Sequence, residues 1–485
     1  MNKALVAVII LSFTLSSCNM LRKGRNGGKN DGQIVGQKSS SWTPQRPKGM
    51  VPIPSGSFVL GQTDYDFTFG NDAPVRTVSV SGFYMDDTET TNSEYHVFVD
   101  YVRDSIARTL LAEKASELGF DPTNGGGSGD ATGIAAYQYV SGSQDGEATP
   151  YDEWLAQNAT GRDGGSGTPA DQRKLNWDVE LVWNKYEYPD IDYVEVMESM
   201  YYPPEERFNG ERLIDVRKLR FKYIWIDQEG AAKEMGNSDT YRIDYRHEEE
   251  VNIYPDTTVW VRDFNYSHND PLHQNYFWHE AYSDYPVVGV SWDQAMAYCA
   301  FKTKKHNDFL STKKKRVGVS NKVIDYRLPT EIEWEYAARG GLQDAPYPWG
   351  GPYLTDDRGC YLANFKPKRG DYIEDQGKGY MYTGPVKTFH ANGYGLYDMA
   401  GNVAEWTSSP YDKAFYQTTS SLNPSIMREH SENKSVRGGS WKDVGYLLMV
   451  SARDWEHKDS ARSFIGFRTV QSFPEGSKIK FKKKR

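Results

Sequence analysis

Cysteine is scarce in this sequence, with only Cys18, Cys299 and Cys360 among 485 residues. Because Cys18 ends an export-type segment, the other two cysteines could form at most one disulfide, and a disulfide-stapled scaffold is excluded. Hydrophobic residues make up 38% and charged residues 25% of the chain. These shares exclude both a disordered chain and a polytopic membrane protein.

A basic surface is also missing, apart from the last residues. The net charge is -9, whereas binding to nucleic acid needs a clustered positive face that neutralises phosphates. Nucleic acid is therefore not expected as a partner. Residues 472–485 form a basic tail that ends in Lys478-Ile479-Lys480-Phe481-Lys482-Lys483-Lys484-Arg485. Such a tail is typical of a solvated end or of a segment that docks on an acidic partner.

The amino terminus has the order of a lipoprotein signal. Lys3 precedes an apolar run over residues 4–15, followed by Ser16-Ser17-Cys18. The run is shorter than the roughly 20 residues that cross a bilayer, and small residues before a cysteine resemble a lipoprotein cleavage site. We expect residues 1–17 to be a signal peptide and Cys18 to be lipidated. A plain secretory signal is the alternative.

Asn19, which follows the lipidated cysteine, resembles the pattern that sorts lipoproteins to the outer membrane. The predicted location is therefore the periplasmic face of that membrane, with the protein held by its lipid. Residues 18–48 are rich in Gly, Asn, Lys, Ser and Gln and lack apolar periodicity, which predicts a flexible tether. The body is expected over residues 49–471.

Three helices are predicted from their caps and apolar spacing. Thr91 and Asn92 precede a helical pattern that reaches about Leu111, Ser291 precedes one over residues 292–301, and Thr330 with Glu333 forms a capping box for residues 330–339. Residues 112–284 are rich in glycine, acidic residues and tyrosine, and indicate a long insertion. Within it, residues 219–227, 240–245 and 257–262 are predicted as strands.

Several ordered motifs carry a family resemblance. They are Pro286-Val287-Val288-Gly289-Val290-Ser291-Trp292, Arg327-Leu328-Pro329-Thr330-Glu331, Gly401-Asn402-Val403-Ala404-Glu405-Trp406, Arg437-Gly438-Gly439-Ser440-Trp441 and Gly466-Phe467-Arg468. Over residues 49–105 and 284–471 the chain resembles the formylglycine-generating-enzyme, or sulfatase-modifying-factor, family. The resemblance implies an α+β, formylglycine-generating-enzyme-like (C-type-lectin-like) fold, rich in irregular loops. Its core would be 49–111 and 285–471, with the insertion at 112–284.

The chemistry of that family depends on a copper-binding cysteine pair between the Arg-Gly-Gly-Ser-Trp motif and a later Ala-Arg. Aligning Ala452-Arg453 on that Ala-Arg puts Gly445 and Val450 at the two cysteine positions. Copper(I) and oxygen activation need thiolate sulfur. We therefore expect no enzyme activity, no cofactor for catalysis and an apolar floor at these positions. Cys299 and Cys360 could be a substitute pair, but a buried structural thiol is the favoured interpretation of Cys299.

The resemblance also implies structural calcium. The first set of ligands would be Asp398, the carbonyls of Gly401 and Val403, and Glu405, all hard oxygen donors. A second set would use Asn364, Phe365 and Tyr380, although Lys378 stands where an acidic ligand is expected. Ordinary hydrogen bonding of the carboxylates is the alternative.

Within the family, the lipoprotein signal and the segments 83–95 and 102–107 resemble the GldK/PorK-type lipoproteins of gliding motility and type IX secretion. That resemblance implies a non-catalytic scaffold that self-associates and builds a periplasmic ring with a GldN/PorN-type protein. The alternatives are a calcium-dependent carbohydrate-binding module and an enzyme of unrecognised chemistry. Tyrosines in the insertion are expected either to anchor an interface or to pack the insertion on the body; they are Tyr188, Tyr193, Tyr201 and Tyr202.

Overall fold

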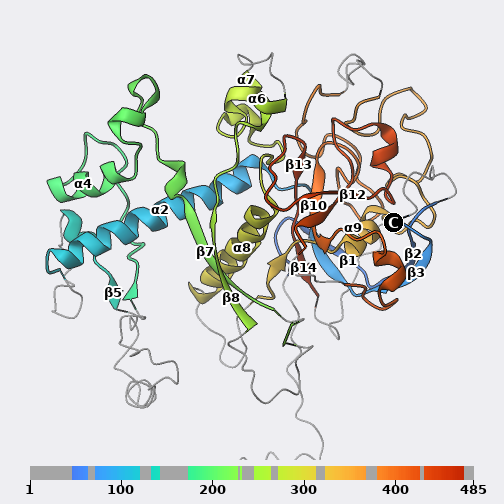
Figure 1. Cartoon of the computed structure of the whole chain (residues 1–485), viewed down its shortest axis with the longest axis horizontal. Helices are drawn as coiled ribbons and strands as arrows, with labels where there is room; N and C mark the ends of the chain where they lie inside the picture. Colours follow the sequence, from blue (N-terminus) through green and yellow to red (C-terminus); the bar gives the residue numbers. More distant parts are fainter. Residues whose placement is uncertain are drawn as a thin grey trace, which may run out of the picture. The chain divides into compact units, whose positions relative to one another are not determined.

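The computed structural model describes most of the unit Arg46–Glu475 (Figure 1). The described residues are 46–63, 72–120, 133–141, 173–227, 230–231, 245–263, 271–312, 323–367, 379–425 and 431–473. The predicted signal peptide, Cys18, nearly all of the tether and the basic residues of the tail lie outside these ranges. No helix within them is both long enough and apolar enough to cross a bilayer.

Two four-stranded sheets form the centre of the unit. The first has the antiparallel order β1-β4-β14-β9, and the second has the order β12-β11-β10-β13, with β10 and β13 parallel. Their bounds are Met50–Ile53 (β1), Phe83–Asp86 (β4), Val470–Ser472 (β14), Tyr326–Arg327 (β9), Asp454–His457 (β12), Asn433–Arg437 (β11), Ala404–Pro410 (β10) and Ile465–Gly466 (β13). Because Val470 lies opposite Met85, the last described strand completes a sheet begun by the first ones.

Shorter elements complete the unit. Two-stranded sheets are formed by β2 (Gly56–Leu60) with β3 (Arg76–Val80), β5 (Val140–Ser141) with β6 (Arg173–Lys174), and β7 (Arg220–Ile226) with β8 (Arg246–Asn252). The remaining helices include α7 (Pro271–Asn275) and α10 (Phe415–Thr418). The strand predicted over residues 219–227 is confirmed by β7. The strand predicted over residues 240–245 lies outside the described residues, apart from Tyr245.

The predicted caps define two helices of the core. α8 spans Trp292–Thr312 and α9 spans Glu331–Ala338. The backbone N–H of Glu333 donates to Thr330 Oγ1 at 3.2 Å, and that of Thr330 donates to Glu333 Oε2 at 2.9 Å. Ser291 and Gln294 make the same reciprocal pair at α8. Both helix starts are confirmed because capping is decided by residues three positions apart.

The Glu333 carboxylate makes folding sensitive to acid. Burial raises the pKa of this carboxylate, but the Arg327 guanidinium lowers it by more than burial raises it. The pKa therefore lies below the usual 4.5. A lowered pKa gives stability that is present above 4.5 and is lost as pH falls through the folded-state value. We expect the free energy of unfolding to fall as pH decreases below about 4.5, and Glu333→Gln to flatten this slope. Urea titrations across that range measure it, with exposed Glu248→Gln as the control; equal slopes in both variants would contradict the prediction.

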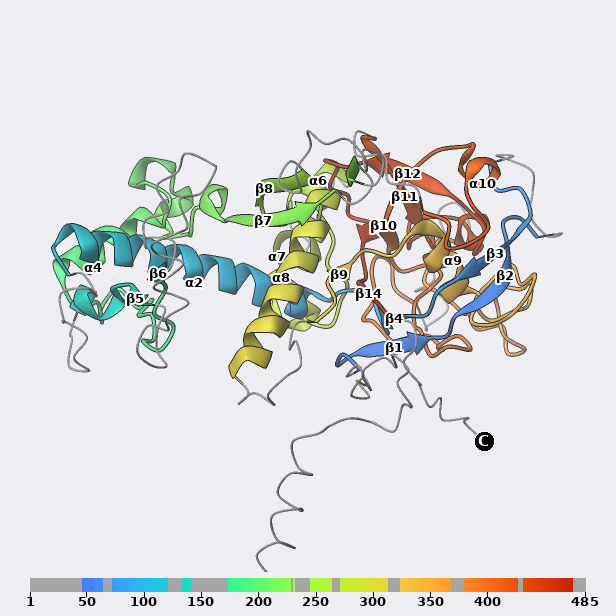
Figure 2. The ribbon, with the colours of Figure 1, turned by 90° about the horizontal axis from the view of Figure 1, so that it is seen from below.

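Helix α2 is longer than predicted and spans Asn92–Glu117. Its first half packs Tyr95, Phe98 and Val99 into the main core. Its second half packs Leu111 and Ala115 against residues that follow position 133. In Figures 1 and 2, α2 leads away from the sheets, and α4 (Ile191–Ser199) and β5 lie at its far end. The helix continues past Leu111 because residues after position 133 bury the apolar face of its second half. The apolar spacing within the helix did not predict this contact.

The tyrosines of residues 133–202 mostly serve packing. Tyr193 is fully buried and Tyr201 is nearly so, both in the cluster that covers the distal half of α2. Tyr193 also accepts from the Val182 N–H at 3.0 Å. Of the two roles expected for the tyrosines, the packing role is confirmed for these two.

The strand predicted over residues 257–262 is wrong, because the structure forms α6 (Val259–Asp263) there. Asp256 Oδ1 accepts from the Thr258 N–H at 2.9 Å, as a turn-forming side chain does at a helix start. Val259 and Trp260 are both buried in one cluster with Trp441. This tertiary packing overrides the strand preference of a Thr, Val and Trp sequence.

Candidate functional site

The two predicted cysteine positions lie in the loop that follows β11. Gly438 and Gly439 leave the strand with φ of 97° and 64°, values that favour glycine. The chain then forms a single 3-10 turn, η10 (Gly445–Leu448), and reaches Val450. The Val450 carbonyl accepts from Arg437 Nη2 at 2.7 Å, and its N–H donates to the Pro346 carbonyl at 2.9 Å. The backbone is thus held firmly at this position.

Neither position carries a thiol, and both are closely packed. A Cβ placed on Gly445 would lie 2.2 Å from Leu354 Cδ1, so the Leu354 side chain occupies that space. Val450 is fully buried in the apolar cluster that contains Ile332 and Met399. A side chain at 445 requires Leu354 to move, and the side chain at 450 points into packed core.

The remaining cysteines do not replace the pair. Cys299 lies on α8 inside the main core, Cys360 is partly exposed, and no disulfide joins these two described residues. Burial raises the pKa of the Cys299 thiol to about 12. At neutral pH this sulfur is therefore protonated and unreactive. The interpretation of Cys299 as a buried structural thiol is confirmed.

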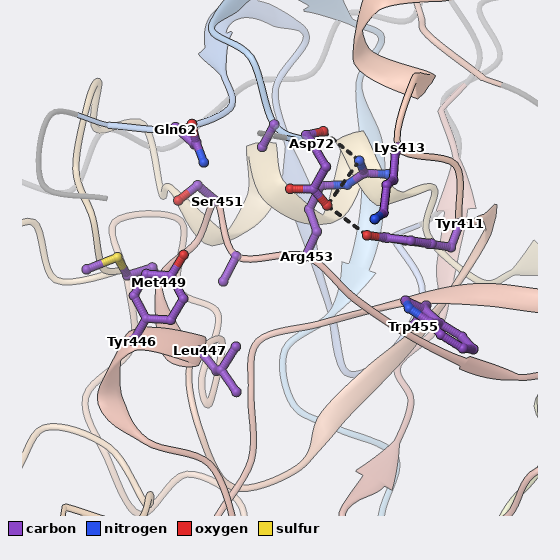
Figure 3. Close-up of a pocket in the computed structure, with 12 residues that line it drawn as sticks. Gln62, Asp72, Tyr411, Lys413, Tyr446, Leu447, Met449, Ser451, Arg453 and Trp455 are labelled. Atoms are coloured by element: carbon purple, nitrogen blue, oxygen red, sulfur yellow. Dashed lines mark hydrogen bonds and ion pairs between the residues drawn. The ribbon is translucent and has the colours of Figure 1, made fainter. Parts of the chain in front are cut away.

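A polar cavity of about 310 Å³ opens beside this loop (Figure 3). Asp72, Tyr411, Lys413 and Trp455 line it together with Arg453. The Tyr411 hydroxyl donates to Asp72 Oδ2 at 2.9 Å, and Arg453 Nη1 donates to the Asp72 carbonyl at 2.7 Å. Gly445 and Val450 do not line this cavity, so the apolar floor expected at those two positions is not part of it.

The cavity is polar partly because the Val450 side chain points away from it. Val450 turns into the core, so the described wall of the cavity is made by Met449 and Ser451 on either side of it. The described lining contains neither cysteine nor histidine. It offers hydrogen bonds, the aromatic side chains of Tyr411, Tyr446 and Trp455, and charge, which suit binding of a ligand rather than thiol chemistry.

The cavity lies above a buried ionic network. Arg453 Nε and Nη2 donate to the two oxygens of Glu331 at 2.6 and 3.0 Å, and Arg437 Nη2 donates to Glu335 Oε2 at 2.5 Å. Burial lowers the pKa of Arg453, but the Glu331 carboxylate raises it more, so the net shift is upward. Arg339 completes the network through Glu335 at 2.6 Å. Because arginine stays protonated in proteins, these guanidinium groups act as fixed positive charges.

The first predicted calcium set surrounds a buried arginine. Asp398 and Glu405 both face Arg468, whose Nη2 is 2.6 Å from Glu405 Oε1 and 3.5 Å from the Asp398 carbonyl. The other Glu405 oxygen accepts from Trp334 Nε1 at 2.7 Å. Gly401 donates its N–H to the Gly438 carbonyl. The Glu405 carboxylate is thus already paired with the Arg468 guanidinium. This pairing is expected if Glu405 makes ordinary hydrogen bonds instead of binding calcium.

Carboxyl groups nevertheless outnumber guanidinium groups around Arg468. Glu89 is fully buried and accepts from the Val403 N–H at 3.1 Å and from Asn402 Nδ2 at 2.9 Å. Burial, followed by the charges of Asp398 and Glu405, raises the pKa of Glu89. Burial likewise raises the pKa of Asp398 to about 6. A divalent cation bound nearby would offset this repulsion, so calcium at Asp398 stays a prediction.

Of the second predicted set, Asn364 is the residue whose contacts bear on a calcium site, and the set stays a prediction. Asn364 Nδ2 donates to the Tyr382 carbonyl at 2.7 Å, and its carbonyl accepts from the Asn402 N–H. Its Oδ1 is buried and has no hydrogen-bond partner. Phe365 is buried beside it in the chain, and Tyr380 lies two residues before Tyr382. An unpartnered buried amide oxygen is the kind of ligand that calcium uses.

Within the described ranges, no three His, Cys, Asp or Glu side chains converge on a point where they could hold a metal ion. The predicted calcium sets differ from such clusters because they include backbone and amide oxygens. Lys378 lies outside the described residues.

The described geometry is that of an α+β domain with irregular connections around a polar cavity and a buried ionic network. The family model of the sulfatase-modifying factor enzyme 1-like domain matches residues 37–473. The chain belongs to this family, and it has the family's mixed helix and sheet fold. The family includes active formylglycine-generating enzymes and inactive members.

The relatives show both branches of the family. The formylglycine-generating enzyme of Bos taurus is 26% identical over 428 residues, which are 88% of this chain and 75% of that protein. The inactive C-alpha-formylglycine-generating enzyme 2 of Bos taurus is 36% identical over 191 residues, 38% of this chain and 50% of that protein. Among solved structures, PvdO from Pseudomonas aeruginosa is similar at 16% identity and a TM-score of 0.42, covering 90% of this chain and all of that one.

Proposed function

We propose that this protein is a non-catalytic member of its family that works as a structural scaffold. The observation that carries the proposal is the replacement of the cysteine pair by Gly445 and Val450. Leu354 fills the space beside Gly445, at 2.2 Å from a Cβ there, and Val450 is fully buried. Without paired thiolates the loop cannot bind copper(I) or activate oxygen by the family's chemistry.

The proposal includes a place and partners. The protein is a lipoprotein held by Cys18 at the periplasmic face of the outer membrane, and it belongs to the type IX secretion and gliding-motility machinery. It self-associates and forms a periplasmic ring with a GldN/PorN-type protein. Support comes from the signal-like order before Cys18 and from the GldK/PorK-type resemblance of segments 83–95 and 102–107. A C-type-lectin-like core carrying residues 112–284 as an insertion is part of the same proposal.

The non-catalytic role is tested by an oxidation assay. The purified chain is incubated with copper(I), oxygen and a cysteine-bearing sulfatase peptide, and formylglycine is measured by mass spectrometry. We expect no product, while a formylglycine-generating enzyme assayed in parallel converts the peptide. Turnover by this chain that exceeds a metal-free blank would reject the proposal.

The assembly role is tested separately by crosslinking. Membranes are crosslinked and dissolved in detergent, and the tagged chain is isolated with whatever is attached to it. We expect one periplasmic protein at a fixed ratio to the chain. Recovery of the chain alone under crosslinking would contradict the scaffold, whatever the oxidation assay shows.

A carbohydrate-binding module is the second candidate function. The observation that favours it is Trp455, which is 47% exposed at the cavity and stacks on Tyr411 with ring centroids 6.1 Å apart. Exposed aromatic faces beside polar groups suit sugar rings. A glycan array probed with and without calcium decides it: binding that disappears on chelation and in Trp455→Ala would favour the module over the scaffold.

Calcium removal gives a further prediction. If calcium is held near Asp398, chelation with EGTA is expected to lower the melting temperature, because a ligand bound only by the folded state stabilises it. Asp398→Asn should make the melting temperature insensitive to EGTA. Glu432→Gln, whose side chain is 72% exposed, is the matched control and should keep the sensitivity. A melting temperature unchanged by EGTA in the unaltered chain would favour ordinary hydrogen bonding of the carboxylates.

A further inference from the structure

An apolar surface lies at the far end of α2 and on α4. Ile191 is 87% and Tyr186 is 85% exposed, and three other large apolar side chains at the end of α2 and on α4 are 37–45% exposed. Ile191 and Val194 are one turn apart and share a face of α4. Exposed apolar side chains on neighbouring elements can mark an interaction site. We call this surface the tip patch; its members are Leu118, Phe120, Tyr186, Ile191 and Val194.

The elements of the tip patch are held together by an ion pair. Lys114, in the last turn of α2, lies 2.9 Å from Glu195 of α4. The bonded Glu195 carboxylate raises the pKa of Lys114, and the charges of Asp192 and Glu117 add to this effect. Three carboxylates therefore surround one ammonium group.

Acidic residues predominate around the tip patch. The acidic side chains near it are Glu113, Glu117, Glu187, Asp192 and Glu195, whereas the basic ones are Lys114 and Lys185. The carboxyl end of α2, a helix of 26 residues, adds the partial negative charge of a helix carboxyl terminus. An apolar surface with an acidic rim fits a segment that is both basic and apolar, and it disfavours an acidic one.

The chain itself contains such a segment. Residues 478–485 hold six basic residues together with Ile479 and Phe481. In an extended segment, residues two positions apart lie on the same side, so Ile479 and Phe481 would face one way while Lys478, Lys480 and Lys482 face the other. The tail therefore carries apolar side chains that match the tip patch and basic side chains that match its acidic rim. These residues lie outside the described ranges, and only their sequence enters here.

We propose that the tip patch binds the basic tail of a second copy of this chain. The inference rests on the proposed scaffold role, because it names the surface through which copies associate. A tail on one copy and a patch on the next make a heterologous contact, and such contacts generate rings when the rotation closes. The main contributions are burial of Ile479 and Phe481 and attraction between the lysines and the acidic rim.

The test uses the full chain made soluble by Cys18→Ser. Sedimentation velocity over a range of concentrations measures self-association, with three variants: deletion of residues 476–485, Ile191→Asp, and Ile226→Asp as a matched control. Ile226 is an exposed apolar residue on β7 at 62% exposure. We expect the deletion and Ile191→Asp to weaken association about tenfold or more, and the control to leave it unchanged. Melting temperatures show that each variant is folded.

A second measurement identifies the occupant. A fluorescent peptide of residues 476–485 is titrated with the tail-deleted chain, and we expect saturable binding that salt weakens and that Ile191→Asp removes. A peptide with Ile479→Ser and Phe481→Ser should bind about tenfold more weakly or worse. Equal binding of both peptides would overturn the apolar part of the contact.

Three outcomes would overturn the inference. The first is a chain that stays monomeric at every concentration. In that case, a mixture of isotope-labelled and unlabelled chains would give tail-to-patch crosslinks only within single copies. The second is tail-dependent binding to anionic lipid vesicles with self-association unchanged by the deletion. The third is self-association that Ile191→Asp leaves intact. These assays contain neither membrane nor periplasmic partner. They can therefore contradict the tail contact while the crosslinking assay supports the scaffold role, and they can support the contact while the crosslinking assay contradicts the scaffold role.

Discussion

Replacing Arg437 by alanine is expected to lower the free energy of unfolding by about 3–5 kcal/mol, because it removes one partner from a buried ionic network. Arg437 is fully buried, donates to Glu335 Oε2 at 2.5 Å and to the Val450 carbonyl at 2.7 Å, and lies 3.5 Å from Glu331. Its loss leaves two buried carboxylates with less positive charge. It also removes the donor that holds the loop after β11.

Urea unfolding monitored by tryptophan fluorescence measures this effect. Arg220→Ala is the matched control, since Arg220 is 56% exposed and its pair with Glu250 spans 3.7 Å; exposed pairs of this kind contribute about 0–1 kcal/mol. We expect the control to change stability by less than about 1 kcal/mol. A loss for Arg437→Ala no larger than that of the control would show that Arg339 and Arg453 balance the carboxylates without it.

Replacing Cys18 by serine is expected to move the protein from the membrane fraction to the soluble fraction. The proposed anchor is the acylated cysteine, and each buried methylene contributes about 0.8 kcal/mol, so several acyl chains give permanent attachment. A serine hydroxyl cannot receive the thioether-linked lipid. No helix among the described residues offers an alternative span.

Fractionation followed by immunoblotting measures this transfer. Cys360→Ser is the control, because it removes a partly exposed thiol that lies far along the chain from the signal. We expect this variant to stay with the membrane. Retention of the Cys18→Ser protein in washed membranes would reject the lipid anchor and leave a protein-mediated attachment in its place.

The sequence predicted the features of the fold that depend on near neighbours. The helix starts at Thr91, Ser291 and Thr330 were correct because a side-chain cap acts over three residues. The end of α2 was placed too early, since the residues that cover its distal half come from positions beyond 133. The helix α6 was mistaken for a strand for the same reason, as its partner Trp441 is remote in sequence.

The candidate site was predictable only in part. The motif after β11 located Gly445 and Val450, and both lie in the loop where the alignment put them. The cavity beside them was not predictable, because Asp72, Tyr411 and Arg453 come from distant segments. The approach of Leu354 to Gly445 has no sequence signal at all, since two loops meet there. The close approach of Leu354 therefore accounts for glycine at position 445 as well as the loss of a catalytic cysteine does.

The pairing of β14 with β4 limits the order of events during synthesis. β4 ends at Asp86, whereas the strand that covers its second edge ends at Ser472, so the ladder between them cannot form until residue 472 has been made. A growing polypeptide therefore carries an open strand edge while the residues between these two strands are translated. Such an edge can pair with the wrong neighbour, and a chain truncated before residue 470 would keep it exposed permanently.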